Sequence, residues 1–149
     1  MKNRPEIAVA LVHHPVLNRQ GESGTTAITS IDMHDFARCC AFYGVEPVYL
    51  VHPAEGMHAL IHDMTDYLKG AGGERNPPRK AVLGAVRCVK TIEEIVDEHG
   101  YQLWYTSATP PEDASMEPSR LLKTEGKHLI VFGTGWGLDA ENMPKPNGW

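Results

Sequence analysis

The sequence predicts an α/β fold with a mostly parallel sheet that helices cover on both faces. Short apolar runs alternate along the chain with stretches of helical periodicity, and the composition is globular, with 42% hydrophobic and 22% charged residues. Strands that alternate with helices are typical of such a sheet. A length of 149 residues without a repeat or a linker suits one domain. We therefore expect a single domain over residues 1–149.

Five strands are expected, each short and rich in apolar residues. The first is a continuous apolar run (IAVALV), as in strands that are buried on both faces. A proline opens the second strand, at a position where the loss of an N–H donor is tolerated. The expected strands are residues 7–12, 47–51, 85–89, 102–106 and 128–132.

Four helices are expected between these strands. The first has Thr29 or Ser30 as its N-cap, and Gly44 stands where a left-handed C-terminal residue is favoured. Thr91 and Glu94 have the spacing of a capping box, which starts the third helix. The expected helices are residues 30–43, 54–69, 92–99 and 118–124.

The net charge of −5 is acidic, whereas proteins that bind nucleic acid usually carry a basic surface. Cations nevertheless gather in one stretch of the chain, at Arg75, Arg79, Lys80, Arg87 and Lys90. An Asn-Pro-Pro run at residues 76–78 within this stretch predicts an exposed loop. The sequence therefore allows a local basic patch on an acidic background, while the global charge counts mildly against RNA binding without excluding it.

No apolar run approaches the roughly 20 residues that a membrane-spanning helix needs. Residues 1–6 are polar and lead directly into the first strand, unlike a signal peptide. Adjacent cysteines within a helix cannot easily form a disulfide, so Cys39, Cys40 and Cys88 are expected to be reduced and mostly buried. We expect a cytoplasmic protein without membrane contact.

Three expected strands end in segments that could carry chemistry, because ligands of parallel sheets lie beyond the carboxyl ends of the strands. These segments are His13-His14-Pro15, residues 106–109 and residues 133–138. Three glycines in five residues suit the close approach of a ligand. They equally suit a tight turn in which Trp136 covers the core, and the spacing favours neither interpretation. The G-x-G-x-G order, after the last strand, fits neither a dinucleotide-binding loop nor a P-loop.

Two helices carry polar side chains with a shared face. His34 and Arg38 are four residues apart, so Arg38 could present its guanidinium to a phosphate or a base. Spacing alone favours the alternative, an exposed ion pair between Asp35 and Arg38. His58 and His62 could begin a metal site, but no convincing third ligand accompanies them, and a solvated helix face is favoured.

Several segments occur in an order found in one bacterial protein group. They are LVHHPVLNRQGE (11–22), TSIDMHDFARCCAFYGVEPVYLVHP (29–53), GGERNPPRKAV (72–82), WYTSA (104–108) and LIVFGTGWGLD (129–139). The D-x-H-D-x-A-R helix and the F-G-T-G-W-G-L turn are the specific parts. Over nearly its whole length the chain resembles a group of the SPOUT superfamily of S-adenosylmethionine-dependent RNA methyltransferases.

This resemblance implies an α/β knot, S-adenosylmethionine as cofactor, an RNA substrate (tRNA or rRNA) and a homodimer. No metal site is expected. It implies Arg38 as the catalytic residue, which would orient an RNA phosphate or the acceptor group. The cofactor-binding residues implied by the resemblance are Thr106, Ser107, Ala108, Gly133, Thr134, Gly135, Trp136, Gly137 and Leu138.

The sequence departs from this group in two places. Related sequences usually carry Asn at the position of Ser30, and they continue past the glycine-rich turn with a helix, an N-H-L-S-V-R-S-A-like loop and a closing helix. Only residues 139–149 follow the turn here, so we expect a C-terminally shortened domain with an incomplete knot. Two alternatives stay open: a non-catalytic remnant that binds S-adenosylmethionine or RNA, and a metal-dependent enzyme that uses His58 and His62.

Overall fold

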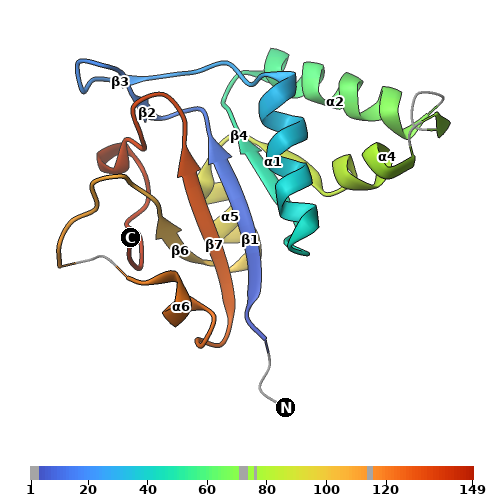
Figure 1. Cartoon of the computed structure of the whole chain (residues 1–149). Coiled ribbons are helices and arrows are strands. Elements are labelled where there is room, and N and C mark those ends of the chain that lie inside the picture. Colours follow the sequence, from blue (N-terminus) through green and yellow to red (C-terminus); the bar gives the residue numbers. More distant parts are fainter. Residues whose placement is uncertain (1–3, 71–73, 76, 114–115) are drawn as a thin grey trace.

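A five-stranded parallel sheet forms the centre of the molecule (Figure 1). The computed structural model describes residues 4–70, 74–75, 77–113 and 116–149. Within them the strand order is β5-β4-β1-β7-β6. The strands are β1 (Glu6–Val12), β4 (Val48–Val51), β5 (Val86–Val89), β6 (Gln102–Tyr105) and β7 (Lys127–Gly133). The α/β fold and all five predicted strands are therefore confirmed.

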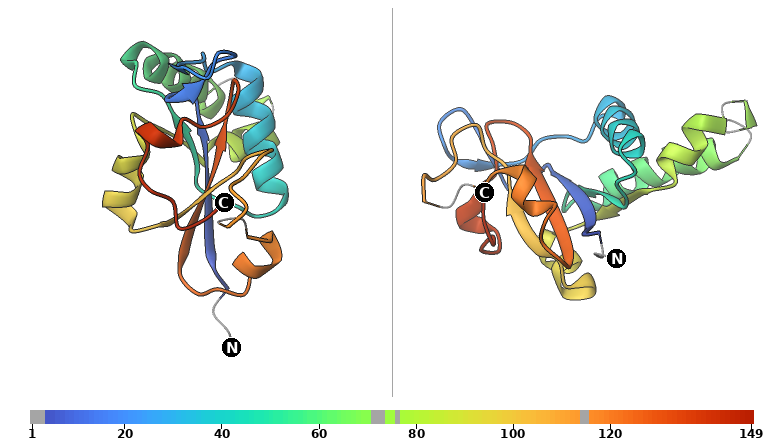
Figure 2. Two further views of the ribbon diagram at one scale, coloured as in Figure 1. Left: turned by 90° about the vertical axis from the view of Figure 1, so that its left-hand side faces the viewer. Right: turned by 60° about the horizontal axis from the view of Figure 1, so that its bottom comes forward.

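Helices cover both faces of this sheet, as predicted. One face carries α1 (Ser30–Phe42), α2 (Glu55–Lys69) and α4 (Pro77–Leu83), and the other carries α5 (Ile92–His99) (Figure 2). The short α6 (Pro118–Leu121) precedes β7, and a 3-10 helix, η1 (Ala140–Asn142), follows it. No helix in the described part of the chain combines the length and apolarity needed to span a bilayer.

The side chains of the strands alternate between two cores because successive residues of a strand point to opposite faces. Leu11 and Leu50 pack with Met33 of α1 on one face, whereas Val12 and Val51 pack with Ile95 of α5 on the other. Two packed layers on a buried sheet explain why β1 and β4 read as continuous apolar runs.

Helix α1 begins where its capping residues place it. The Thr29 hydroxyl accepts a hydrogen bond from the Asp32 backbone N–H, and the Asp32 carboxylate accepts one from the Thr29 N–H. Gly44 follows the helix with a φ of 66°, in the left-handed region that glycine tolerates. The predicted helix start is confirmed. Ile31, in the first turn, is 69% exposed.

Helix α4 was not predicted. The prolines at residues 77–78 indicated a loop, but they occupy the first turn of a helix, where a missing N–H costs nothing. Asn76 of that predicted loop lies outside the described residues.

The predicted capping box of α5 is only half formed. The Thr91 hydroxyl accepts a hydrogen bond from the Glu94 N–H, but the Glu94 carboxylate accepts from the Lys90 N–H instead of the Thr91 N–H.

A small hairpin between β1 and α1 was also not predicted. Strands β2 (Val16–Leu17) and β3 (Ser23–Gly24) pair antiparallel and lie beyond the carboxyl ends of β1 and β7 (Figure 1). Val16 is almost fully buried and belongs to the core on the α5 side of the sheet. The hairpin therefore covers part of the end of the sheet at which ligands of this fold class bind.

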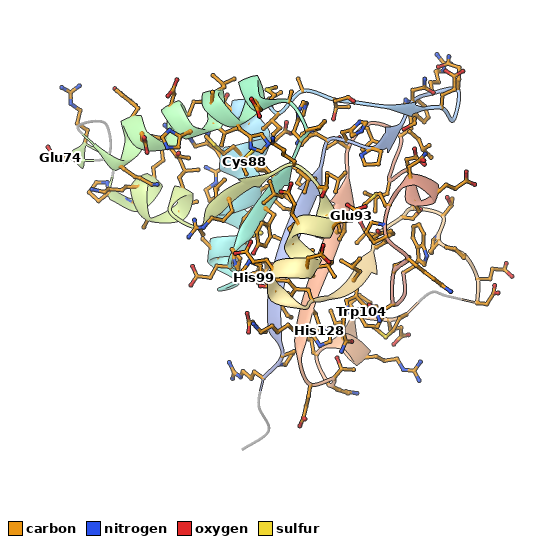
Figure 3. The ribbon with its side chains drawn as sticks, turned by 180° about the vertical axis from the view of Figure 1, so that it is seen from behind. Glu74, Cys88, Glu93, His99, Trp104 and His128 are labelled. Carbon is orange, nitrogen blue, oxygen red and sulfur yellow. The ribbon has the colours of Figure 1, made fainter. Side chains whose placement is uncertain are left out.

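The buried histidine of β7 is fully hydrogen-bonded. The indole N–H of Trp104 donates to Nδ1 of His128 over 3.0 Å (Figure 3). Because Nδ1 accepts this hydrogen bond, Nε2 of His128 carries the ring proton and donates to the Thr124 hydroxyl. The Thr124 hydroxyl in turn donates to the Leu121 carbonyl. His128 is thus a structural residue that locks α6 against the sheet.

The last residues of the chain run along β6. The Asn147 N–H donates to the Leu103 carbonyl, the Leu103 N–H donates back to Asn147 Oδ1, and the Tyr105 N–H donates to the Gly148 carbonyl. The ring of Trp149 packs edge-on against that of Tyr105. These contacts satisfy backbone groups of β6 that an edge strand leaves unpaired.

The three cysteines are free, as predicted, but not mostly buried. Cys39 is exposed, and Cys40 and Cys88 are partly exposed. Partial burial is enough to raise the pKa of Cys40 and of Cys88 to about 11. These two thiols are therefore protonated at neutral pH and are poor nucleophiles.

Candidate functional site

Three polar segments meet beyond the carboxyl ends of the central strands. β1 and β7 are neighbours, and so are β7 and β6, so the residues that follow each strand lie at the same end of the sheet. The Thr134 N–H donates to the Val12 carbonyl, and the Thr106 N–H donates to the Val131 carbonyl. We call residues 133–138 the glycine turn and residues 106–109 the serine loop. The topology thus places the two predicted cofactor-binding segments on adjacent strands.

The glycines of the glycine turn have structural reasons of their own. A Cβ on Gly133 would lie 2.8 Å from the backbone nitrogen of Leu138, which is too close for any side chain. Gly135 and Gly137 have φ values of 60° and 113°, in the region that L side chains rarely adopt. The turn also pairs with the hairpin, because the Trp136 N–H donates to Leu17 and the Leu17 N–H donates to Gly137. The segment is therefore held in one conformation.

Trp136 lies at the outer side of the glycine turn. The sequence left open whether this indole covers the core, and the structure excludes it, because Trp136 is 67% exposed. Leu138, by contrast, is buried in the core on the α5 side. A rigid turn thus presents a large aromatic surface to solvent.

A chain of hydrogen bonds joins His13, Thr26 and Thr134. The Thr134 hydroxyl donates to the Val12 carbonyl at 3.0 Å, so its oxygen is the acceptor for the Thr26 hydroxyl. The Thr26 oxygen can then only accept from Nδ1 of His13, at 3.0 Å. This order assigns the proton of neutral His13 to Nδ1 and leaves Nε2 as an acceptor.

His13 is 1% exposed, and its Nε2 has no hydrogen-bond partner within the described residues. Burial lowers the pKa of His13, and the nearby Asp32 carboxylate acts in the opposite direction. Burial also lowers the pKa of His52, at the end of β4, with His14 as a further cause. The imidazole of His13 is therefore neutral at physiological pH and serves to fix the loop that carries Thr26.

Asp139 anchors the end of the glycine turn. Its side chain is almost fully buried, and Asn142 Nδ2 donates to its Oδ2 at 2.8 Å. Hydrogen bonds from the Ser23 and Asn142 side chains lower the pKa of Asp139. The carboxylate thereby links the hairpin to η1. Sequence reasoning missed both Asp139 and Thr26, and no spacing pattern marked either residue.

The serine loop is more open than the glycine turn. The Thr106 hydroxyl donates to the Val131 carbonyl at 3.0 Å, which fastens the start of the loop to β7. Ser107 and Ala108 are exposed, and the Ser107 oxygen accepts from the Thr109 N–H. These residues can contact a ligand without a rearrangement of the core.

Arg38 lies elsewhere on the molecule. Its side chain is 73% exposed on α1, and one guanidinium nitrogen bonds to the Asp35 carboxylate, the ion pair that the spacing predicted. It lines a hollow of about 430 Å³ together with His34, Pro78, Arg79 and Val82, which we call the α1–α4 hollow. No described residue of the glycine turn or of the serine loop lines this hollow. The predicted site residues therefore fall into two groups.

The geometry gives no support to a metal site at His58 and His62. His58 Nε2 lies 2.6 Å from the His52 carbonyl, and His62 Nδ1 lies 3.2 Å from Asp66 Oδ2. Among the residues that the structure describes, no three His, Cys, Asp or Glu side chains are arranged to hold a metal ion.

The chain is thus an α/β protein with a candidate ligand site beyond the carboxyl ends of a parallel sheet. Residues 6–148 match the model of the SAM-dependent RNA methyltransferase family. The chain belongs to this family.

Relatives with curated descriptions agree with this assignment. The chain is 35% identical over 150 residues to a tRNA (guanine-N(1)-)-methyltransferase of Nitratidesulfovibrio vulgaris and 31% identical over 146 residues to one of Oleidesulfovibrio alaskensis. These matches cover 94% and 93% of this chain but only 35% and 34% of the relatives. An uncharacterized protein of Aquifex aeolicus is 27% identical over 147 residues, which is 92% of this chain and 72% of that protein.

One solved structure shares the fold. It is a probable methylase family protein from Haemophilus influenzae, with a TM-score of 0.56 and 19% sequence identity. The match covers 95% of this chain and 56% of that one. At this identity the likeness concerns the fold alone.

Proposed function

We propose that this chain transfers a methyl group from S-adenosylmethionine to RNA, as a domain of the SPOUT type. The family match over residues 6–148 supports the cofactor and the reaction class. The two relatives named as tRNA methyltransferases support tRNA as the RNA, although the chain spans about a third of their length. The observation that carries the proposal is the position of the glycine turn and the serine loop on the neighbouring strands β7 and β6.

The proposed cofactor site consists of residues 106–108 and 133–138. Bound S-adenosylmethionine would supply an electrophilic methyl group on its sulfonium. Backbone groups of the fixed glycine turn and the exposed Ser107 and Ala108 fit such a ligand, because a rigid loop loses little conformational entropy when it binds. The hydrogen bonds of Thr106 and Thr134 to the strands keep both loops in place.

Arg38 is proposed as the catalytic residue that orients the RNA. Its exposed guanidinium lies with the α1–α4 hollow and not with the two loops, which suits a contact to the substrate more than one to the cofactor. Methyl transfer is an in-line displacement, so the position of the acceptor atom supplies much of the rate. The Asp35 carboxylate limits the rotamers of Arg38 and so prepares this contact.

Two finer features of the family resemblance are part of the same proposal: a cytoplasmic location and a homodimer. Exposed apolar side chains support self-association. Phe42 and Tyr43 are 83% and 74% exposed, and their rings contact each other edge-on. Apolar groups gathered on a surface commonly mark a protein interface.

Calorimetric titration of the 149-residue chain with S-adenosylmethionine tests the cofactor site. We expect saturable one-to-one binding, with heat that disappears in a variant whose glycine turn is disrupted. The absence of binding by a folded protein, as judged by circular dichroism, would contradict the proposal.

Transfer of a labelled methyl group to a tRNA transcript tests the reaction itself. Incorporation that depends on both the protein and the RNA is expected. Cofactor binding without incorporation would instead identify the chain as a non-catalytic binding module.

A further inference from the structure

The most basic segment of the chain has no part in the proposed cofactor site. Residues 75–92 contain Arg75, Arg79, Lys80, Arg87 and Lys90 and no aspartate or glutamate, in a chain with a net charge of −5. Two of these cations, Arg79 and Lys80, belong to α4, whose residues 77–80 are all exposed. A local concentration of positive charge on an acidic protein indicates a surface for an anion.

The fold brings this segment to α1. Helices α1 and α4 are packed against each other, and between them lies the α1–α4 hollow, with a volume of about 430 Å³. Arg38 enters from α1 and Arg79 from α4, while Pro78 and Val82 provide apolar walls. The two arginines are 41 positions apart in the sequence. Their convergence is therefore a product of the tertiary structure.

The chemistry of the hollow suits a phosphate group. A guanidinium offers five N–H donors in a planar fork that matches the oxygens of a phosphate. Asp35 engages one nitrogen of Arg38, which leaves further donors of that fork for a ligand. The Asp35 carboxylate would repel an anion if it stood alone, but it is paired, and the second guanidinium adds to the positive charge.

His34 completes the lining. Its Nδ1 lies 2.6 Å from the Ser30 carbonyl and so carries a proton, which fixes the ring. Its Nε2 is covered by protein and has no partner within the described residues. The imidazole thus forms a rigid wall beside Arg38, against which a ribose could pack.

We propose that the α1–α4 hollow binds a backbone phosphate of the RNA, through Arg38 and Arg79 together. The inference rests on the proposed function, because the RNA substrate is the ligand. It adds a second contact surface, separate from the cofactor loops, and it assigns Arg79 as an RNA-binding residue. A phosphate held here would fix the strand relative to α1.

The test is the affinity of the chain for an unmodified tRNA transcript, measured by fluorescence anisotropy between 50 and 200 mM salt, in wild type and Arg79→Gln. Each phosphate contact contributes about 0.7 to 0.9 to the slope of log K against log salt. Because Arg38 still contacts the same phosphate, we expect Arg79→Gln to lower that slope by less than this amount and to weaken binding roughly threefold at 0.15 M salt. Arg38→Gln combined with Arg79→Gln removes the phosphate contact, so it should lower the slope by the full amount and weaken binding about tenfold.

Two further variants serve as controls. Arg120→Gln removes the same charge from α6 and should leave the affinity and the slope unchanged. Helix α6 follows the edge strand β6 in the chain, whereas α4 precedes β5 at the other edge of the sheet. Arg79→Lys keeps the charge without the planar fork, so the slope should persist while the affinity falls less than in Arg79→Gln. Arg79 is exposed, so neither Arg79→Gln nor Arg79→Lys should lower the thermal unfolding midpoint.

The outcomes separate this inference from the proposed function. If the chain binds tRNA and Arg79→Gln matches wild type in affinity and slope, the α1–α4 hollow is not a phosphate site, although RNA binding stands. An equal loss in Arg120→Gln would show a general charge effect and would also overturn the inference. If wild type does not bind tRNA while calorimetry detects S-adenosylmethionine, both the RNA proposal and this inference fail, and the cofactor site stands.

Discussion

The Thr26 hydroxyl donates a hydrogen bond to the Thr134 hydroxyl, which lies 108 residues further along the chain. The Thr134 hydroxyl donates to the Val12 carbonyl, and Nδ1 of His13 donates to the Thr26 hydroxyl. Three segments that each follow or precede a different secondary-structure element are thereby joined at one end of the sheet. The conformation of the glycine turn depends on this junction as much as on its own glycines.

Thr134→Val should reveal the strength of that junction. The substitution keeps the shape of the side chain but removes the donor to Val12 and the acceptor for Thr26. We expect a loss of about 1–3 kcal/mol in the free energy of unfolding, measured by urea denaturation. Thr109→Val, in the exposed part of the serine loop, should change it by less than about 0.5 kcal/mol. Equal stability of the two variants would argue against the hydrogen-bonded chain.

Gly133→Ala tests the need for close backbone packing in the glycine turn. The added Cβ would lie 2.8 Å from the Leu138 nitrogen, so the turn must shift. We expect a destabilisation of about 1–3 kcal/mol and a loss of calorimetric heat with S-adenosylmethionine. The matched control is Gly56→Ala at an exposed position of helix α2, where a Cβ meets nothing within 4 Å. It should be neutral or stabilise by up to about 1 kcal/mol.

The stability of the protein should fall as the pH drops below about 6.5. Burial lowers the pKa of His13 in the native state, so the unfolded chain binds a proton there that the native chain does not. Above the unfolded pKa both states are neutral, and the contribution is constant. Urea denaturation between pH 7 and pH 5 should show a smaller decrease for His13→Asn, which retains a donor for Thr26.

His52, whose pKa is also lowered, accounts for part of the remaining decrease. The control for the pH experiment is His62→Asn, because the His62 side chain is 72% exposed. It should retain the wild-type dependence on pH. A His13→Asn variant with that same dependence would show that His13 is accessible to protons in the native state.

Arg38→Ala should abolish methyl transfer to RNA while the affinity for S-adenosylmethionine stays within a few-fold of wild type. The reason is spatial, since Arg38 and the two cofactor loops share no described contact or hollow. Single-turnover transfer and calorimetry give the two quantities separately. A large loss of cofactor affinity would mean that Arg38 serves the cofactor site and that the proposed role in RNA binding is wrong.

Most of the fold could be predicted because it depends on periodicity. The buried strands are apolar runs, and Thr29 and Gly44 mark the ends of α1 by local chemistry. Helix α4 was not predicted because two adjacent prolines usually indicate a loop, whereas here they fill the first turn of a helix. The β2–β3 hairpin was not predicted because strands of two residues are too short to show an alternation of apolar and polar residues.

The site could be predicted only in part, because its parts depend on different kinds of information. The glycine turn was visible through its composition. The hydrogen bond between His13 and Thr26 forms only when the chain has folded. The same holds for the hollow that Arg38 and Arg79 line together. A hydroxyl in a polar loop or an arginine on an exposed helix has no local pattern that distinguishes a partner from solvent.

The pairing of β1 with β7 has a consequence for how the protein folds. Its register joins Glu6 to Lys127 and Val12 to Gly133, so the middle of the sheet closes a loop of roughly 120 residues. Contacts so distant in sequence slow folding, typically to milliseconds or seconds. Until β7 arrives, one edge of the apolar strand β1 stays open to other chains, and aggregation is the competing reaction. Because the glycine turn follows β7 directly, cofactor binding should appear only with this last step, and a ligand that binds the turn would favour the folded chain.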